Sequence, residues 1–217
     1  MHTTRIALTL VAFAGIAAAD DPKPTRMTWS FDAEKAEATP ASFAFGRTGE
    51  GAAGKWVVKA VKDAPSGGNV LAQVDADRTD NRFPVAIVDK PVLADLALSV
   101  KCKPVSGAVD QACGLVFRYQ DADNYYVTRA NVLENNVRFY YVKKGKRQQV
   151  ASWSGKVASG AWHDYKVEMK GDHVVITFDG KPVLDVKDRT FTQAGKVGVW
   201  TKADSVTYFD DLTVEPR

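Results

Sequence analysis

The 217-residue chain is nearly balanced in charge, with 29 Lys and Arg against 26 Asp and Glu and a formal net charge of +3. Because the basic residues are spread along the chain and form no basic stripe, the composition argues against a nucleic-acid-binding protein. No apolar run reaches the roughly 20 residues that cross a bilayer, so we expect no membrane span.

The first 19 residues have the pattern of a secretory signal peptide. Arg5 precedes an apolar run over 6–16, and alanines at 17–19 offer a cleavage site. We therefore expect a secreted or periplasmic protein. A polar tether over 20–28 is predicted to lead into a single domain over 29–217, which we expect to be monomeric.

Short segments of alternating apolar and polar residues follow one another along this domain, and no window has an apolar stripe at helical spacing. Residues 33–53, rich in Ala, Gly, Thr and Pro, predict an irregular region. The pattern as a whole predicts an all-β fold, a two-sheet antiparallel β-sandwich or jelly roll. The predicted strands cover residues 55–62, 69–75, 83–88, 95–103, 112–120, 125–131, 136–144, 146–153, 162–170, 173–179, 181–187, 196–202 and 205–215.

Two cysteines, Cys102 and Cys113, are present in a chain that we expect to be exported. Oxidising compartments allow disulfides to persist, so we predict that the two are bonded. The alternative is a metal site, but two thiols without a second Cys or His pair make a poor zinc shell.

Three arginines fall on one face of three consecutive predicted strands. In 112–120, 125–131 and 136–144, the residues that alternate with the inward apolar ones include Arg118, Arg129 and Arg138. Pairing across the connecting loop sets Arg129 opposite Arg138, and like charges in that position are destabilising.

An acidic group should offset these arginines. Glu134, in the loop between the second and third of these strands, is one candidate, and Asp164 and Glu168 are two others. The counter-charge could also be supplied by a ligand rich in hydroxyls or carrying a carboxylate, which the planar fork of arginine binds in bidentate fashion.

Two interpretations of this face remain open. One is a solvated strand face with salt bridges, which is the rule for antiparallel sheets. The other is a carbohydrate-binding face on the concave sheet of a jelly roll, where aromatic rings cover sugar rings and charged groups fix hydroxyls. The predicted ligand-binding residues are Arg118, Tyr125, Arg129, Glu134, Arg138, Tyr140 and Trp200, the last bordering the groove.

Several stretches resemble known families. The segments WHDYKVEMKGDHVVITFDGKPVLDV and GKVGVWTKADSVTYFDDLTVE resemble the concanavalin A-like lectin/glucanase superfamily. With GLVFRYQDADNYYVTRAN, the chain resembles more narrowly the 3-keto-disaccharide hydrolase-like domain, also labelled family 16 glycoside hydrolase-like, over about 29–214. This resemblance implies a concanavalin A-like jelly roll that binds or acts on carbohydrate. A laminin-G-like protein-interaction module is a further alternative, and it would require a large exposed apolar patch.

Catalysis by paired carboxylates is poorly supported by the sequence. The E-x-D-x-E string of family 16 glucanases is absent, and retaining hydrolysis needs two carboxyl groups about 5 to 5.5 Å apart. Asp121 and Asp123 have the pattern of turn residues, and Asp210 and Asp211 are expected to point to opposite faces of a strand.

Hydrolysis or elimination of a 3-keto-glycoside remains open as an alternative activity. It needs a base that removes a proton beside the carbonyl, and the candidates are His163, Glu134 and Glu168. His163 has the parity of a core residue, which favours a structural role, so no catalytic residue is assigned.

We predict no cofactor and no metal site. The sequence DADN at 121–124 has the composition of a structural calcium site. Asp and Asn in a hairpin connection are, however, mostly turn formers.

Overall fold

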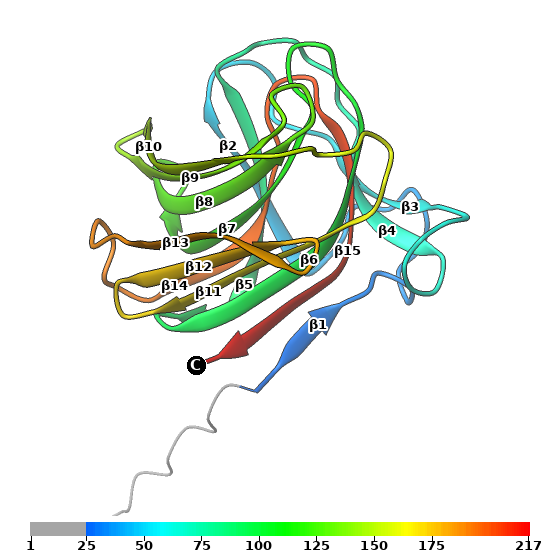
Figure 1. The fold of residues 1–217 in the computed structure, drawn as a ribbon. Helices are drawn as coiled ribbons and strands as arrows, with labels where there is room; N and C mark the ends of the chain where they lie inside the picture. The colour runs from blue at the N-terminus through cyan, green and yellow to red at the C-terminus, as the bar shows by residue number, and fades with distance from the viewer. Residues whose placement is uncertain (1–24) are drawn as a thin grey trace, which may run out of the picture.

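The computed structural model describes residues 25–217, which form two antiparallel β-sheets packed face to face (Figure 1). The prediction of an all-β jelly-roll sandwich is confirmed. This part of the chain contains no helix, and therefore none that could cross a membrane. The signal peptide predicted for residues 1–19 lies outside the described residues.

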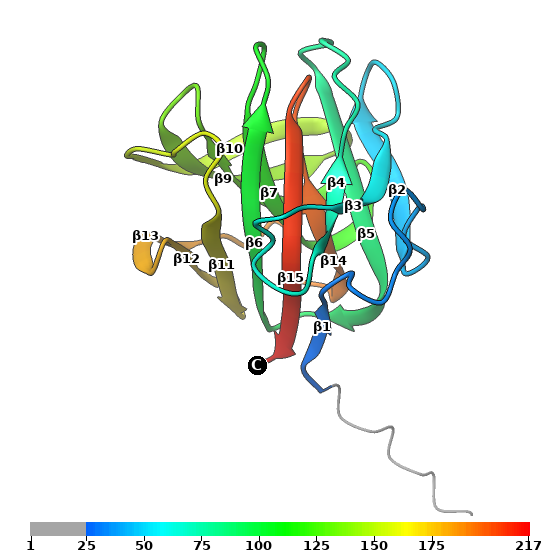
Figure 2. The same ribbon diagram turned by 90° about the vertical axis from the view of Figure 1, so that its right-hand side faces the viewer.

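Sheet A contains eight strands and faces the viewer in Figure 2. The eighth strand, β1 (Met27–Trp29), pairs with the C-terminal strand, so residues 27 and 28 belong to the sheet and not to the predicted tether. The order of the other seven is β13 (Lys181–Lys187), β12 (His173–Phe178), β11 (His163–Lys170), β6 (Leu96–Ser106), β15 (Val206–Pro216), β4 (Asn69–Gln73) and β3 (Trp56–Ala60).

Sheet B contains seven strands. Their order is β10 (Lys146–Ser154), β9 (Asn136–Lys143), β8 (Asn124–Asn131), β7 (Ala112–Asp121), β14 (Gly195–Trp200), β5 (Arg82–Leu93) and β2 (Phe43–Gly49). Strand β2 lies in the segment that the sequence predicted to be irregular, and that prediction is wrong. Alternation there is interrupted by glycine at 46, and the strand is defined by its pairing with β5.

The main hydrophobic core fills the space between the sheets. Sheet B contributes Leu115, Phe117 and Phe139 on the face that the alternation predicted, and sheet A contributes Val100 and Val167 among others. The predicted disulfide between Cys102 and Cys113 is confirmed, and it joins β6 of sheet A to β7 of sheet B inside this core.

Sheet B is strongly curved. Strands β10 and β5 are five positions apart, about 24 Å in a flat sheet at about 4.8 Å per strand. The guanidinium of Arg147 on β10 nevertheless lies 4.6 Å from the ring centre of Phe83 on β5. Likewise, Thr48 on β2 and Tyr125 on β8 are hydrogen-bonded at 2.8 Å across four positions. The outer face of sheet B is therefore a concave surface.

A second cluster of buried side chains fills this concave face, which we call the sheet B hollow. Trp200 lies against Gly114, where an added Cβ would come within 3.2 Å of the indole ring. The ring of Trp200 also stacks on Phe83 with centroids 5.6 Å apart. The buried members of the cluster are Phe83, Val85, Ile87, Ala112, Val116, Tyr125, Val127, Tyr140, Val142 and Trp200.

A β-bulge in β15 brings two neighbouring carboxylates to the same side chain. The register shifts between Asp210 and Thr213, and the hydroxyl of Ser66 donates to Asp210 at 3.1 Å and to Asp211 at 2.9 Å. The expectation that the two aspartates face opposite ways is therefore wrong. Burial raises the pKa of Asp210 to about 6, despite hydrogen bonds from the backbone amides of Ser66 and Asp211.

Asp210 makes stability depend on pH. The pKa of Asp210 is about 6 in the folded state and 3.8 in the reference state, so the folded state binds this proton more tightly than the unfolded state does. Proton binding therefore stabilises the fold at low pH, and this stabilisation is lost as the pH rises from about 4 to above 6. In Asp210→Asn, the free energy of unfolding relative to wild type should rise over that range by up to about 3 kcal/mol.

Urea unfolding at a series of pH values measures this difference. The matched control is Asp123→Asn, because Asp123 is exposed, and it should follow the wild-type curve. A difference between Asp210→Asn and wild type that stays constant from pH 4 to pH 7 would contradict the prediction.

Candidate functional site

Arg129 and Arg138 lie side by side at the edge of the sheet B hollow, where both contact Tyr140. We call this edge, formed by Arg129, Glu134, Arg138 and Tyr140, the mouth of the hollow. The register of β8 and β9 pairs these two residues directly, as the sequence predicted. Glu134, in the connection between the two strands, joins them through one oxygen: its Oε2 lies 2.9 Å from Arg129 Nη2 and 2.9 Å from Arg138 Nη1. The sequence prediction of Glu134 as a counter-charge is therefore confirmed.

The carboxylate of Glu134 is fixed in place by its neighbours. Its backbone amide donates to Asn131 at 2.9 Å, and Asn136 donates to Oε2 at 3.1 Å. Burial opposes ionisation of this carboxyl, but the hydrogen bond from Asn136 and the charges of Arg129 and Arg138 outweigh it and lower the pKa of Glu134. The group is thus an ionised acceptor and a weak base.

Tyr140 lies beneath the two arginines. Its hydroxyl accepts from Arg129 Nη2 at 3.2 Å and from Arg138 Nη1 at 3.4 Å. Arg129 and Tyr140 are buried, whereas the side chains of Arg138 and Glu134 are 32% and 37% exposed. Arg138 and Glu134 are therefore the members of this group that a ligand can reach from solvent.

A second carboxylate lies behind this group. Asp110 accepts a hydrogen bond from Asn131 at 2.7 Å and forms an ion pair with Lys202 at 2.9 Å. Burial raises the pKa of Asp110, although Lys202 opposes the rise. Lys202 also pairs with Asp80 at 2.6 Å. Sequence reasoning missed Asp110 and Lys202, because neither lies on the alternating face of the three arginine strands.

Arg118 does not belong to this site. A bulge in β7 places it at φ 46°, and its guanidinium donates to the backbone carbonyls of Ala94, Phe191 and Gly171 at 2.6–2.8 Å. Residue 195 is glycine because a Cβ there would lie 2.3 Å from the Arg118 carbonyl carbon. The prediction that three arginines share one face is thus wrong for Arg118, which ties loops at the opposite end of the strand.

Tyr125 and Trp200 lie in the hollow but are fully buried. The hydroxyl of Tyr125 is bonded to Thr48, as described above, and Trp200 is covered by Arg147 with 5.8 Å between the guanidinium and the ring centre. The expectation that Trp200 borders an open groove is wrong, because the curvature of the sheet brings β10 over it.

The other candidate counter-charges and bases lie away from the hollow. Asp164 and Glu168 both lie on sheet A, where Asp164 pairs with Lys101 and Glu168 pairs with Lys166 and with the C-terminal Arg217. They therefore do not neutralise the arginines.

His163 is a structural residue in this fold. It is 5% exposed, its Nδ1 lies 2.8 Å from Asp179, and its Nε2 lies 2.9 Å from the Ala158 carbonyl oxygen. Its ring also stacks on Phe178. Both ring nitrogens are occupied, which leaves no free position for proton transfer.

Residues 121–124 form the turn between β7 and β8. Asp121 accepts hydrogen bonds from the backbone amide of Asp123 and from the side chain of Asn124, as an Asx-type turn requires. Within residues 25–217, no group of three or more His, Cys, Asp or Glu residues is arranged to hold a metal ion.

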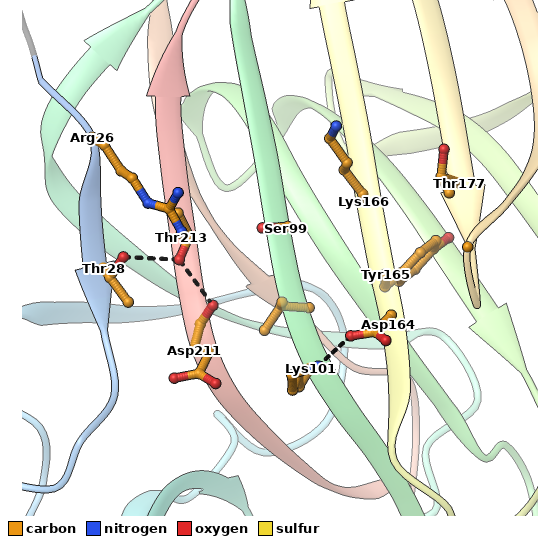
Figure 3. Close-up of a pocket in the computed structure, with 12 residues that line it drawn as sticks. Arg26, Thr28, Ser99, Lys101, Asp164, Tyr165, Lys166, Thr177, Asp211 and Thr213 are labelled. Carbon is orange, nitrogen blue, oxygen red and sulfur yellow. Dashed lines mark hydrogen bonds and ion pairs between the residues drawn. The ribbon is translucent and has the colours of Figure 1, made fainter. Parts of the chain in front are cut away.

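The outer face of sheet A has a broad shallow depression of about 630 Å³ (Figure 3). Several of its polar groups already have protein partners: Lys101 pairs with Asp164 at 2.5 Å, and Thr28 with Thr213 at 2.9 Å. These groups would have to give up a protein partner to bind a ligand. The hollow of sheet B, where charged and aromatic groups converge, is the stronger candidate site.

One protein family, described as the 3-keto-alpha-glucoside-1,2-lyase-like domain, matches residues 48–215. This chain belongs to that family. The resemblance to the 3-keto-disaccharide hydrolase-like domain, drawn from the sequence motifs, is thereby confirmed. No curated protein matches the sequence.

Solved structures share the fold of this 3-keto-alpha-glucoside-1,2-lyase-like domain. The carbohydrate-binding module CBM66 from Bacillus subtilis is 22% identical with a TM-score of 0.61, over 78% of this chain and 95% of that one. A native glycosidic hydrolase is 14% identical with a TM-score of 0.58, over 88% and 95%. The VIP36 exoplasmic/lumenal domain is 10% identical with a TM-score of 0.55, over 89% and 90%. At these identities the likeness shows the fold.

Glu134→Gln should destabilise the domain by about 1 to 3 kcal/mol, because it leaves the buried Arg129 without its anionic partner. Glu168→Gln is the matched control: its pairs with Lys166 and Arg217 are exposed, and we expect a loss below about 1 kcal/mol. Chemical unfolding at pH 7 measures both, and equal losses would contradict the prediction.

Arg118→Met should cost at least about 3 kcal/mol, because three backbone carbonyls lose their donor. Arg189→Met, at an exposed arginine paired with Asp172, should change stability by less than about 0.5 kcal/mol. Thermal unfolding distinguishes the two variants. A loss in Arg118→Met as small as that in Arg189→Met would contradict the prediction.

Proposed function

We propose that this domain binds carbohydrate at the mouth of the sheet B hollow, through Arg138 and Glu134 above the aromatic floor that includes Tyr140. The observation that carries the proposal is the Arg129–Glu134–Arg138 ion cluster, in which the partly exposed side chains of Arg138 and Glu134 are held in fixed orientations on a concave surface. Ligand sites combine such a concave, largely apolar lining with a few polar groups that fix orientation.

The family and the fold support a carbohydrate as the ligand class. The chain belongs to a family described by a 3-keto-alpha-glucoside lyase activity, and the solved structures that share its fold include a carbohydrate-binding module and a glycosidic hydrolase. Glu134 supplies fixed acceptors and Arg138 supplies fixed donors, which together match the paired hydroxyl groups of a sugar ring.

Elimination at a 3-keto-glycoside is the second candidate function, and the family match favours it. That reaction needs a base beside the carbon next to the ketone. Glu134 is within reach of solvent but has a lowered pKa, while Asp110 has a raised pKa but is buried against Lys202. Because neither carboxylate combines basicity with access, binding is the function that the geometry supports better.

A protein-interaction module has less support. The large apolar side chains exposed within residues 25–217 are Met27, Phe45, Val92 and Leu133. They lie on separate elements, whereas a protein-binding surface of laminin-G type would need a contiguous apolar patch.

The test is calorimetric titration of the protein with a panel of oligosaccharides and 3-keto-disaccharides, with product analysis on the same samples. Arg138→Gln should weaken binding about tenfold or more, since it removes charged donors from the mouth of the hollow. Lys101→Gln, in the depression of sheet A, is the matched control and should bind like wild type.

Each outcome assigns the function. Heat of binding without product supports a binding domain. Product formation that is lost in Glu134→Gln or Asp110→Asn, with binding retained, identifies a lyase or hydrolase. Loss of binding in Lys101→Gln but not in Arg138→Gln would move the site to sheet A, and absence of binding to the whole panel would overturn the proposal.

A further inference from the structure

The chemistry of the bound sugar follows from an arginine that the structure leaves without an anion. Arg147 projects from β10 over the sheet B hollow, with its guanidinium 4.6 Å from the ring centres of both Phe83 and Tyr140. Its side chain is partly exposed, and its Nη1 is buried without a hydrogen-bond partner among the described residues. Its contacts with the rings hold the cation in place but leave its charge unneutralised.

The neighbours of Arg147 increase this excess of positive charge. Arg129 and Arg138 both contact the hydroxyl of Tyr140, whose ring lies under Arg147. Glu134 is shared between Arg129 and Arg138, so one carboxylate serves two cations.

The nearby carboxylate of Asp110 is already engaged. Asp110 and Asp80 both pair with Lys202. Three guanidinium groups therefore meet around one tyrosine with a single carboxylate among them.

Desolvation makes this arrangement costly without an anion. Arg129 is 1% exposed, and its Nε is also buried without a partner. Burial also lowers the pKa of Arg147, because desolvation disfavours the charged form of its guanidinium. A buried or half-buried cation is retained in a protein when an anion pairs with it, and the protein supplies none to Arg147 within residues 25–217.

We propose that the sugar bound at the mouth of the hollow carries a carboxylate, as a uronic acid does, and that this carboxylate pairs with Arg147 and Arg138. The planar fork of arginine matches a carboxylate in bidentate geometry, and the aromatic floor beneath Arg147 fixes the plane of that fork. The inference rests on the proposed function of this same site, for which it names the ligand class.

The test compares two disaccharides that differ only at one end, one with a terminal glucuronate and the other with a terminal glucose, by calorimetry on the full chain. Wild type should bind the glucuronate form about tenfold or more tightly, and the preference should shrink at high ionic strength. In Arg147→Gln most of the preference should be lost, because Arg138 alone remains to pair with the carboxylate. Arg189→Gln, at an exposed arginine at the Arg118 end of the molecule, is the control and should keep the wild-type preference.

Folding of each variant is checked by circular dichroism and by its unfolding midpoint. If Arg147→Gln does not fold, Arg147→Lys keeps the charge without the planar fork and should lose most of the preference. The salt dependence of wild type tests the inference without any variant.

The outcomes separate the two proposals. Binding of the glucose form without preference for glucuronate overturns the carboxylate assignment and leaves the carbohydrate-binding function standing. Binding of neither disaccharide, nor of the wider panel, overturns the function itself. A disaccharide carrying sulfate in place of the carboxylate is the third probe. Tighter binding of that form would overturn the carboxylate assignment and identify the anionic group of the ligand as a sulfate.

Discussion

The curvature of sheet B is the constraint on which the rest of the structure depends. In a flat sheet, β10 and β5 would be too far apart for their side chains to meet, and the outer face would be open to water. Because the sheet curls, Arg147 covers Phe83 and Trp200, and a face that would otherwise be solvated becomes a second apolar cluster. The same curvature brings charged residues together at the mouth of the hollow. Partial exclusion of water there lowers the effective dielectric constant and so strengthens the electrostatic interactions among them.

The ion cluster at the mouth shows how this protein keeps arginines in a partly dry place. Arg129 is almost fully buried, which is tolerable because Glu134, Asn136 and Tyr140 accept from it. The charges of Arg129 and Arg138 and a hydrogen bond from Asn136 hold the pKa of Glu134 low and its side chain in one orientation. A carboxylate arranged this way recognises a ligand well and takes up a proton poorly, so the stabilising interactions of the cluster also shape the chemistry available to it.

Parts of this site were predictable from periodicity. Alternation along β8 and β9 placed Arg129, Arg138 and Tyr140 on one face, and hairpin pairing set the two arginines opposite each other with Glu134 in the loop. The same argument failed for Arg118, because one β-bulge reverses side-chain direction and a bulge has no reliable signature in alternation. Gly195 is a local sign of this in the sequence, because a residue without a Cβ is needed where the Arg118 backbone approaches it closely.

The sequence by itself determined the strands other than β1 and β2, the disulfide and the family, because these follow from local alternation, from cysteine content and from motifs that are continuous in the chain. Only the tertiary structure decided how strongly sheet B curves and brought Arg147, Asp110 and Lys202 to the site. Those residues come from separate segments, and their meeting depends on sheet curvature, which is the sum of small twists over seven strands. No local sequence pattern predicts this accumulated curvature, so the contacts across the hollow could not be predicted from the sequence.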